Sequence, residues 1–269
     1  MGRILAPSTR IYDPSREKPP FEITQRYGLD RRNAKVSVDG LVGYWLMNEG
    51  SGNTVQDLSG NRYVGTFGAG AASPTWISGL HGPALNFDGG DNINITGFTS
   101  ASVNHTFVMW VKSTQDTTTK YLFDASGDRF ILAWHISGQT AFGFYDGEWK
   151  AYSANKPPND GLWHNIILTF DSSNSKAIYC LDGVYNNETT YTNSTLSGTV
   201  KLFSLFNNTS HWTGDCSYFA YYNRVLTASE KAQLNREPFC QLAQPRLMVN
   251  VPVAPPAGIP ILRRRRECA

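Results

Sequence analysis

The sequence predicts an all-β protein in which two antiparallel sheets pack face to face as a sandwich. Aromatic residues make up 13% of the 269 residues and charged residues only 17%, a balance that favours a turn-rich β protein over a helical one. Short runs of aromatic and β-branched residues recur along the chain, and clusters of Gly, Asn, Asp and Pro separate them. Runs of this length and spacing indicate stacked sheets, which often use about 200 residues as one unit.

Three zones are expected along the chain. Residues 1–39 contain four prolines, many basic residues and no sustained hydrophobic period, so we expect an extended proline-rich arm. Residues 40–238 contain the strand signals and form the folded domain. Residues 239–269 contain five prolines, which exclude a helix and any central strand, so we expect a second extended arm with an arginine tail.

Eight segments of the central zone are predicted to be strands, because each is a short apolar run that ends in turn residues. In chain order they are residues 41–47, 107–112, 129–136, 140–145, 163–170, 176–181, 199–206 and 215–222. Gly50 and Gly52 give the chain the freedom to turn sharply after the first strand. One helix is expected after the last strand, because Thr227-Ala-Ser-Glu230 is a capping box, and Pro238 prevents continuation much beyond Arg236.

The core of the sandwich is expected to contain large aromatic side chains that lie within these apolar runs. We predict burial between the sheets for Trp45, Phe87, Trp110, Trp163 and Phe170.

A set of motifs in a fixed order resembles the laminin G-like, concanavalin A-like jelly roll over about residues 40–238. The motifs are Gly40-Leu-Val-Gly-Tyr-Trp45, Asn48-Glu-Gly-Ser-Gly52, Asp57-Leu-Ser-Gly-Asn61, His81-Gly-Pro-Ala-Leu-Asn-Phe-Asp-Gly89, Phe107-Val-Met-Trp-Val-Lys112, Gly161-Leu-Trp-His164, Tyr179-Cys-Leu-Asp-Gly183 and Tyr222-Asn-Arg-Val-Leu-Thr227. The resemblance implies two curved antiparallel sheets of about a dozen strands, with the first and last strands near one another.

The segment WLMNEGSGN, followed by DLSGN, resembles the corresponding segment of this domain in tailed-phage structural proteins. In those proteins, too, a proline-rich arm precedes the domain and a short apolar tail follows it. This resemblance implies a non-enzymatic phage virion protein. We expect a capsid decoration or head-surface protein, anchored by its arms to other virion subunits such as the major capsid protein. The alternative is a carbohydrate-binding adhesin, a tail or fibre component that contacts host glycans.

The expected location is the virion, after synthesis in a host cytoplasm, because the first residues contain no apolar segment typical of a signal peptide. A membrane partner is not expected, because no apolar run approaches the length that spans a bilayer. The formal net charge of +2 gives no global attraction for nucleic acid. A homo-oligomer remains open.

The partner-binding residues are expected in the C-terminal arm, where apolar residues alternate with prolines and four arginines follow. They are Leu247, Val249, Val251, Val253, Ile259, Ile261, Leu262, Arg263, Arg264, Arg265 and Arg266. An apolar extended segment of this kind is typical of an arm that lies on a neighbouring protein surface. The arginines could bind the phosphates of nucleic acid or an acidic protein surface, and we favour a protein surface.

No catalytic residues are predicted. Retaining glycosidases on this fold present Glu-x-Asp-x-x-Glu along one strand, so that the acids share a face, and the sequence has no such run. Asp146, Asp171 and Asp182 occur where turns are expected and are read as turn formers.

A calcium site is considered at Glu49, Asp57 and Asn61, because calcium takes oxygen ligands from carboxylates and amides in loops. The alternative is that Asp57 and Asn61 only form the turn. Relatives in the resembled family carry an acidic pair in the final strand, where this chain has Ser217 and Tyr218. Calcium is therefore possible but is not expected to be required, and no cofactor is predicted.

A sugar site needs exposed aromatic rings with a few polar neighbours. The candidates are Tyr145, Trp149, Tyr152 and Trp212, which occur in polar surroundings near predicted loops. The alternative is that these rings belong to the sandwich or to an interface. The cysteines are read as free structural thiols, and a bridge between Cys180 and Cys216 is the alternative.

Overall fold

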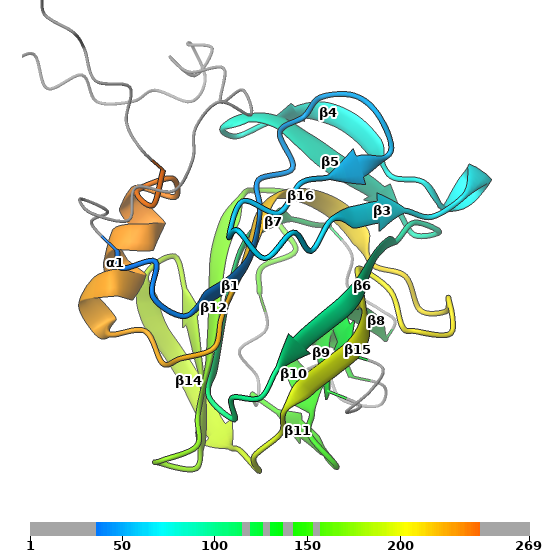
Figure 1. Cartoon of the computed structure of the whole chain (residues 1–269). Coiled ribbons are helices and arrows are strands. Elements are labelled where there is room, and N and C mark those ends of the chain that lie inside the picture. Colours follow the sequence, from blue (N-terminus) through cyan, green and yellow to red (C-terminus); the bar gives the residue numbers. More distant parts are fainter. Residues whose placement is uncertain (1–35, 115–118, 126–129, 137–141, 153–156, 243–269) are drawn as a thin grey trace, which may run out of the picture.

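The computed structural model describes residues 36–114, 119–125, 130–136, 142–152 and 157–242. Within them, two eight-stranded sheets face each other, and all the paired strands are antiparallel (Figure 1). This confirms the predicted all-β sandwich and the jelly-roll arrangement that the resemblance implied.

The first sheet has the order β14-β13-β12-β7-β16-β5-β4, and β1 also pairs with β16. Its strands are β1 (Leu41–Trp45), β4 (Thr75–Gly79), β5 (Gly82–Asp88), β7 (His105–Lys112), β12 (His164–Asp171), β13 (Lys176–Leu181), β14 (Val184–Thr190) and β16 (Thr213–Tyr222). The pairing of β1 with β16 places the first strand beside the last, as the resemblance implied.

The second sheet has the order β11-β10-β9-β8-β15-β6-β3-β2. Its strands are β2 (Thr54–Val55), β3 (Gly65–Phe67), β6 (Ile93–Ser100), β8 (Lys120–Ala125), β9 (Phe130–His135), β10 (Gly143–Tyr145), β11 (Trp149–Ala151) and β15 (Leu196–Leu202). A short 3-10 helix, η1 (Gly70–Ala72), precedes β4. All eight predicted strand segments overlap strands of the structure.

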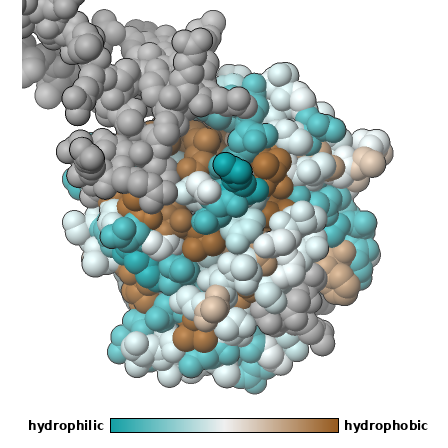
Figure 2. Space-filling view, viewed as in Figure 1, coloured by the Kyte–Doolittle hydropathy of each residue, from teal (hydrophilic) through white to brown (hydrophobic). Residues whose placement is uncertain are grey.

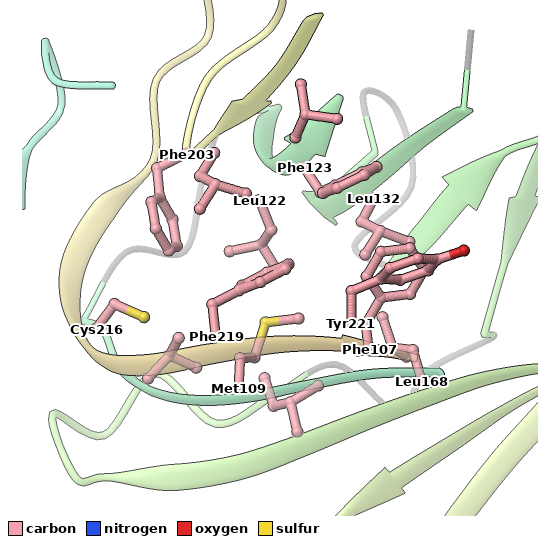
Figure 3. Close-up of a cluster of buried hydrophobic side chains, with 14 of the residues drawn as sticks. Phe107, Met109, Leu122, Phe123, Leu132, Leu168, Phe203, Cys216, Phe219 and Tyr221 are labelled. Carbon is pink, nitrogen blue, oxygen red and sulfur yellow. The ribbon is translucent and has the colours of Figure 1, made fainter. Parts of the chain in front are cut away.

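The main core fills the space between the two sheets. Figure 3 shows side chains of β7, β12 and β16 pointing toward those of β8 and β9. Trp45, Phe87 and Phe170 are completely buried there, as predicted. On the face of the molecule seen in Figure 2, by contrast, apolar surface lies in separate patches among hydrophilic residues.

Trp110 and Trp163 do not belong to this core, and their predicted burial between the sheets is wrong. Trp110 alternates along β7 with Met109 and Val111, whose side chains point inward, so its own ring lies on the outer face of the first sheet. Trp163 precedes β12 and is half-buried, with the Lys112 ammonium 5.5 Å from its ring centroid.

A second apolar cluster covers the outer face of the first sheet. The helix α1 (Ala228–Arg236) contributes Leu234, and Figure 1 shows this helix outside the first sheet. Thr227 caps the helix as predicted, since its hydroxyl accepts the Glu230 N–H and the Glu230 carboxylate accepts the Thr227 N–H. The helix ends at Arg236, before Pro238.

The two ends of the described chain also pack against this face. Val36 and Val38 are buried on it, and so are Cys240 and Leu242. The packed unit therefore extends beyond the predicted boundaries at residues 40 and 238. The rest of both predicted arms, 1–35 and 243–269, lies outside the described residues.

Cys180 and Cys216 are free and buried, so the alternative of a bridge between them is wrong. Cys180 lies on β13 and Cys216 on β16, and two strands of the same sheet separate them. Three strand spacings amount to about 14 Å, well beyond the reach of a disulfide. Within the described ranges, no helix combines the length and apolarity that crossing a membrane requires.

Candidate functional site

The turn after β1 is organised by the side chain of Asp57. Its carboxylate accepts hydrogen bonds from the backbone N–H groups of Tyr44, Ser59 and Tyr63, at 2.9, 2.8 and 3.0 Å. Asn61 donates from its side-chain amide to the Val42 carbonyl at 2.9 Å. These hydrogen bonds show Asp57 and Asn61 as turn-forming residues, which is the role expected from the sequence as the alternative to calcium binding.

Glu49 lies in the same turn, where its carboxylate accepts the Gln56 N–H at 2.6 Å. Burial raises the pKa of this carboxyl group, and the backbone hydrogen bonds to it act in the opposite direction. Among the described residues, no cluster of three or more His, Cys, Asp or Glu side chains is arranged to hold a metal ion.

The outer face of the second sheet carries a row of residues that are in register across seven strands. Interior side chains such as Phe144 and Leu132 face the first sheet, so their neighbours along each strand face outward. From β3 to β11 the row is Thr66, Asn94, Lys201, Asp124, Ile131, Tyr145 and Trp149. The row is polar in its first half and apolar in its second.

Aromatic rings gather at the β11 end of this row. The Trp149 ring lies 5.3 Å from that of Tyr145, edge to face, and 6.0 Å from that of Tyr121, with which it is stacked. The contact with Tyr121 reaches from β11 to β8 across the small residues Ala133 and Gly143. We call Tyr121, Tyr145 and Trp149 the aromatic platform. Trp149 keeps 42% of its surface exposed.

A loop, residues 203–212, closes the platform on the side of β8. The Phe206 N–H donates to the Asp124 carboxylate at 2.7 Å, and the Lys201 ammonium donates to the Asn208 side chain. Leu205 packs against the cluster that includes Tyr121. The loop thus buries the centre of the row and leaves the end with the platform open. Burial also lowers the pKa of Lys201 in the centre of the row.

The structure separates the four predicted sugar-binding residues into two pairs. Tyr145 and Trp149 meet on the platform, whereas Tyr152 and Trp212 are completely buried in the main core. The prediction is therefore wrong for Tyr152 and Trp212, because an aromatic ring inside the sandwich offers no face to a ligand. Trp212 directly follows His211, and Tyr152 lies between Ala151 and Ser153, so neither local sequence indicates an inward orientation.

Sequence reasoning missed Tyr121, because the segment of β8 was not recognised as a strand. The run KYLFDA is rich in aromatic and apolar residues and could have been read as one. No local signal pairs Tyr121 with Trp149, because their contact depends on the order of four strands in the sheet.

Two of the three predicted turn acids occupy turns, and the third ends the strand that leads into one. Asp146 begins the turn between β10 and β11, and Asp182 begins the turn between β13 and β14. Asp171 ends β12, and its carboxylate accepts the Asn174 side-chain amide at 2.7 Å. The predicted partner-binding residues of the C-terminal arm, from Leu247 to Arg266, lie outside the described residues.

A family model described as the concanavalin A-like lectin/glucanases superfamily matches residues 87–230. The match covers more than half of the chain, including β7 to β16 and the start of α1. A search of curated proteins finds no match.

Solved structures with the same fold include domain 4 of an extracellular GH43 arabinanase from Geobacillus stearothermophilus, in complex with arabinotriose. It is 20% identical with a TM-score of 0.61, and the alignment covers 72% of this chain and 98% of that domain. The binding domain of Paraclostridial Mosquitocidal Protein 1 is 15% identical with a TM-score of 0.57, over 75% of this chain. A Trypanosoma rangeli sialidase mutant is 15% identical with a TM-score of 0.56, over 81% of this chain.

The chain spans 53% of the mosquitocidal binding domain and 37% of the sialidase. At these identities the likenesses establish a shared fold.

Proposed function

Because the chain belongs to the concanavalin A-like lectin/glucanase superfamily, we propose that it is a carbohydrate-binding domain whose ligand lies on the aromatic platform. The observation that carries the proposal is the half-exposed Trp149 ring, which Tyr121 and Tyr145 support on the outer face of the second sheet. A sugar ring has apolar C–H faces, and a flat aromatic ring that is held in place is a suitable partner for them.

The solved structures add a starting point for ligands. One of them is a domain in complex with arabinotriose, and a domain with this architecture can therefore hold a short arabinose chain. Arabinotriose is accordingly the first oligosaccharide to test here, together with a broad set of host and bacterial glycans.

The domain is proposed to bind glycans without cleaving them. Glycoside hydrolysis by the usual mechanism needs two carboxyl groups that flank the scissile bond within about 5 to 9.5 Å of each other. Among the acids near the platform, Asp124 is completely buried under the 203–212 loop, whereas Glu148 is exposed and lies 3.5 Å from the Lys150 ammonium. A buried carboxylate that accepts a backbone N–H cannot reach a ligand on the platform, so Glu148 has no partner acid in Asp124.

The biological setting that we propose is a phage particle, with the domain as an adhesin of the tail or a fibre. The described chain ends pack on the outer face of the first sheet, and the platform lies on the outer face of the second. A domain attached through its flanking segments would therefore present the platform away from its attachment. The platform favours the adhesin over capsid decoration, and both assignments rest on the sequence resemblance.

A glycan array probed with the full-length protein tests the proposed function. We expect binding to a limited set of oligosaccharides, and loss of that binding in the Trp149→Ala variant. Tyr185→Ala is the matched control, because Tyr185 is an exposed aromatic residue on β14 of the other sheet. An array without any bound glycan, or a Trp149→Ala variant that binds as the wild type does, would overturn the proposal.

A further inference from the structure

The hairpin that carries Tyr145 and Trp149 has little secondary structure to hold it. β10 and β11 pair through only three residues each, and β11 is the edge strand of its sheet. The turn between them contains Gly147 with φ of 112°, a conformation that favours glycine. Rings on such a short edge hairpin need a further restraint to keep a fixed geometry.

That restraint lies on the inner face of the same hairpin. Alternation places Tyr145 and Trp149 outward, and Asp146 and Lys150 inward. Their side chains are 0% and 6% exposed, and the Lys150 ammonium lies 3.0 Å from both carboxylate oxygens of Asp146. The pair is desolvated, so each charge depends on the other and on its remaining polar contacts, which for Lys150 include the exposed Glu148 carboxylate at 3.5 Å.

Thr192 completes the cluster from outside the hairpin. Its backbone N–H donates to the Asp146 carboxylate at 2.6 Å, and its hydroxyl accepts from the Lys150 ammonium at 2.6 Å. Thr192 belongs to the segment that leads from β14 in the first sheet to β15 in the second. The three residues, Asp146, Lys150 and Thr192, form a polar staple between this segment and the hairpin.

The crossover segment is itself fixed to the core. Tyr191 is buried, and its hydroxyl donates to the Val103 carbonyl at 2.9 Å. Three residues further on, the Ser194 carbonyl lies 2.7 Å from Nε2 of the buried His105. The staple therefore ties the short edge hairpin of the second sheet to a segment that the core already holds.

We propose that Asp146, Lys150 and Thr192 are positioning residues that set the orientation of Tyr145 and Trp149 for glycan binding. This inference rests on the proposed function of the platform. The staple residues act through the hairpin, since they lie on the face opposite to the rings. Loosening the staple leaves the platform residues present but no longer held in one arrangement.

The test uses Thr192, because its side chain is exposed and can be changed with little risk to the fold. Thr192→Val removes the hydroxyl partner of Lys150 and keeps the backbone N–H that Asp146 accepts. Thr192→Ser restores the hydroxyl and is the matched control. Lys150→Met removes the ion pair, and the double variant Asp146→Asn with Lys150→Met removes both charges in case the single variant does not fold.

Two readouts separate positioning from stability. The first is the indole N–H resonance of Trp149 in the free protein, assigned by its absence in Trp149→Phe. The second is the affinity for the glycan selected on the array. We expect Thr192→Val to shift the Trp149 resonance and to weaken binding by about fivefold, the scale of one hydrogen bond, while Thr192→Ser resembles the wild type.

The outcomes are distinguishable. If the wild type binds no glycan, the proposed function fails, and the Trp149 resonance alone decides whether the staple orients the ring. If Thr192→Val and the folded charge variant both keep the wild-type Trp149 resonance, the staple proposal is overturned, whatever the glycan data show. An unchanged affinity in both variants, with glycan binding intact in the wild type, overturns it as well.

Discussion

Asp57 shows how one side chain can define a turn. Its two carboxylate oxygens connect β1 with the segment that follows residue 57, through the backbone N–H groups of Tyr44 and Tyr63 and the hydroxyl of Ser59. Hydrogen bonds to a charged acceptor are stronger than those between neutral groups. If the carboxylate is removed, its half-buried N–H donors lose their acceptor, which lowers the stability of the folded state.

We therefore expect Asp57→Ala to lower the free energy of unfolding by about 2–4 kcal/mol. Asn61→Ala, in the same turn, removes the hydrogen bond from the side-chain amide to the Val42 carbonyl. We expect this change to lower the free energy of unfolding by about 1 kcal/mol or less. Urea unfolding of both variants measures the difference. Equal and small losses in the two variants would show that the carboxylate does not organise the turn.

The buried His105 and the half-buried His81 make the stability depend on pH. Burial lowers the pKa of His105 to about 4 and that of His81 to about 4. In the folded protein His105 is held between the Tyr221 hydroxyl and the Ser194 carbonyl, at 2.7 Å from each. A histidine in the unfolded chain has a pKa near 6.5 and takes up its proton first.

The stabilisation linked to His105 is therefore complete above about pH 6.5 and is lost as the pH falls toward 4. A lowering of the pKa from 6.5 to about 4 corresponds to about 3 kcal/mol for this residue. Unfolding free energies measured between pH 7.5 and 4.5 should fall steeply for the wild type and less steeply for a folded His105→Gln variant. Parallel curves would contradict this assignment.

Residue by residue, the sequence indicated chemical type better than orientation. Trp149 and Trp212 both follow polar residues, yet one is half-exposed on an edge hairpin and the other is completely buried. Trp212 lies next to β16, and its ring packs on Phe87 and Phe203 in the main core. Only the pairing of distant strands decides which side of the sheet such a ring occupies.

At the scale of elements, the helix α1 is fixed by its N-terminus. The Thr227–Glu230 capping box is reinforced by Arg224, whose guanidinium contacts both carboxylate oxygens of Glu230, at 3.0 and 2.6 Å. The same guanidinium donates to the Asp39 carbonyl at 2.7 Å. The cap thus connects the helix with the start of the described chain.

Thr227→Ala should reduce the free energy of unfolding by about 1 kcal/mol, because the Glu230 N–H loses its side-chain acceptor. Ser229→Ala, at an exposed position in the first turn of the same helix, is the control and should have almost no effect or stabilise slightly. Thermal and urea denaturation measure both. A Thr227→Ala variant as stable as Ser229→Ala would show that the Thr227 cap does not stabilise the protein.

The predicted strands were those with dense aromatic or β-branched runs. Apart from β8, whose run KYLFDA could have been recognised, many of the missed strands were short, polar or irregular. β2 and β3 have two and three residues, and β14 reads VYNNETT, which is polar because it is the edge of the first sheet. Gly97 interrupts β6 with φ of 69°. Such segments become strands because neighbouring strands offer hydrogen-bond partners, which a single sequence does not display.

At the scale of the whole molecule, the ends of the described chain complete the domain. Val36 and Leu242 are buried in the cluster that also contains Tyr44 and Leu234. A fragment of residues 40–238 therefore exposes apolar surface that a fragment of residues 36–242 covers.

We expect the 40–238 fragment to be less stable than the 36–242 fragment by at least about 3 kcal/mol, since each buried aliphatic side chain contributes about 1.5–3 kcal/mol. Differential scanning calorimetry of the two purified fragments measures this. Identical melting temperatures would mean that the terminal residues add nothing to the fold. On the phage proposal, the longer fragment should fold alone and fail to join particles, because it lacks the flanking segments.

The proposed function depends on the binding of a glycan to the ring of Trp149. The most direct measurement is the dissociation constant of the array-selected glycan for the full-length protein, determined by isothermal titration calorimetry for the wild type, Trp149→Ala and Tyr185→Ala. We expect at least about tenfold weaker binding for Trp149→Ala, because a central aromatic contact is lost, and an unchanged dissociation constant for Tyr185→Ala. Equal affinity in the wild type and Trp149→Ala, or a loss confined to Tyr185→Ala, would show that the ligand does not bind on the platform.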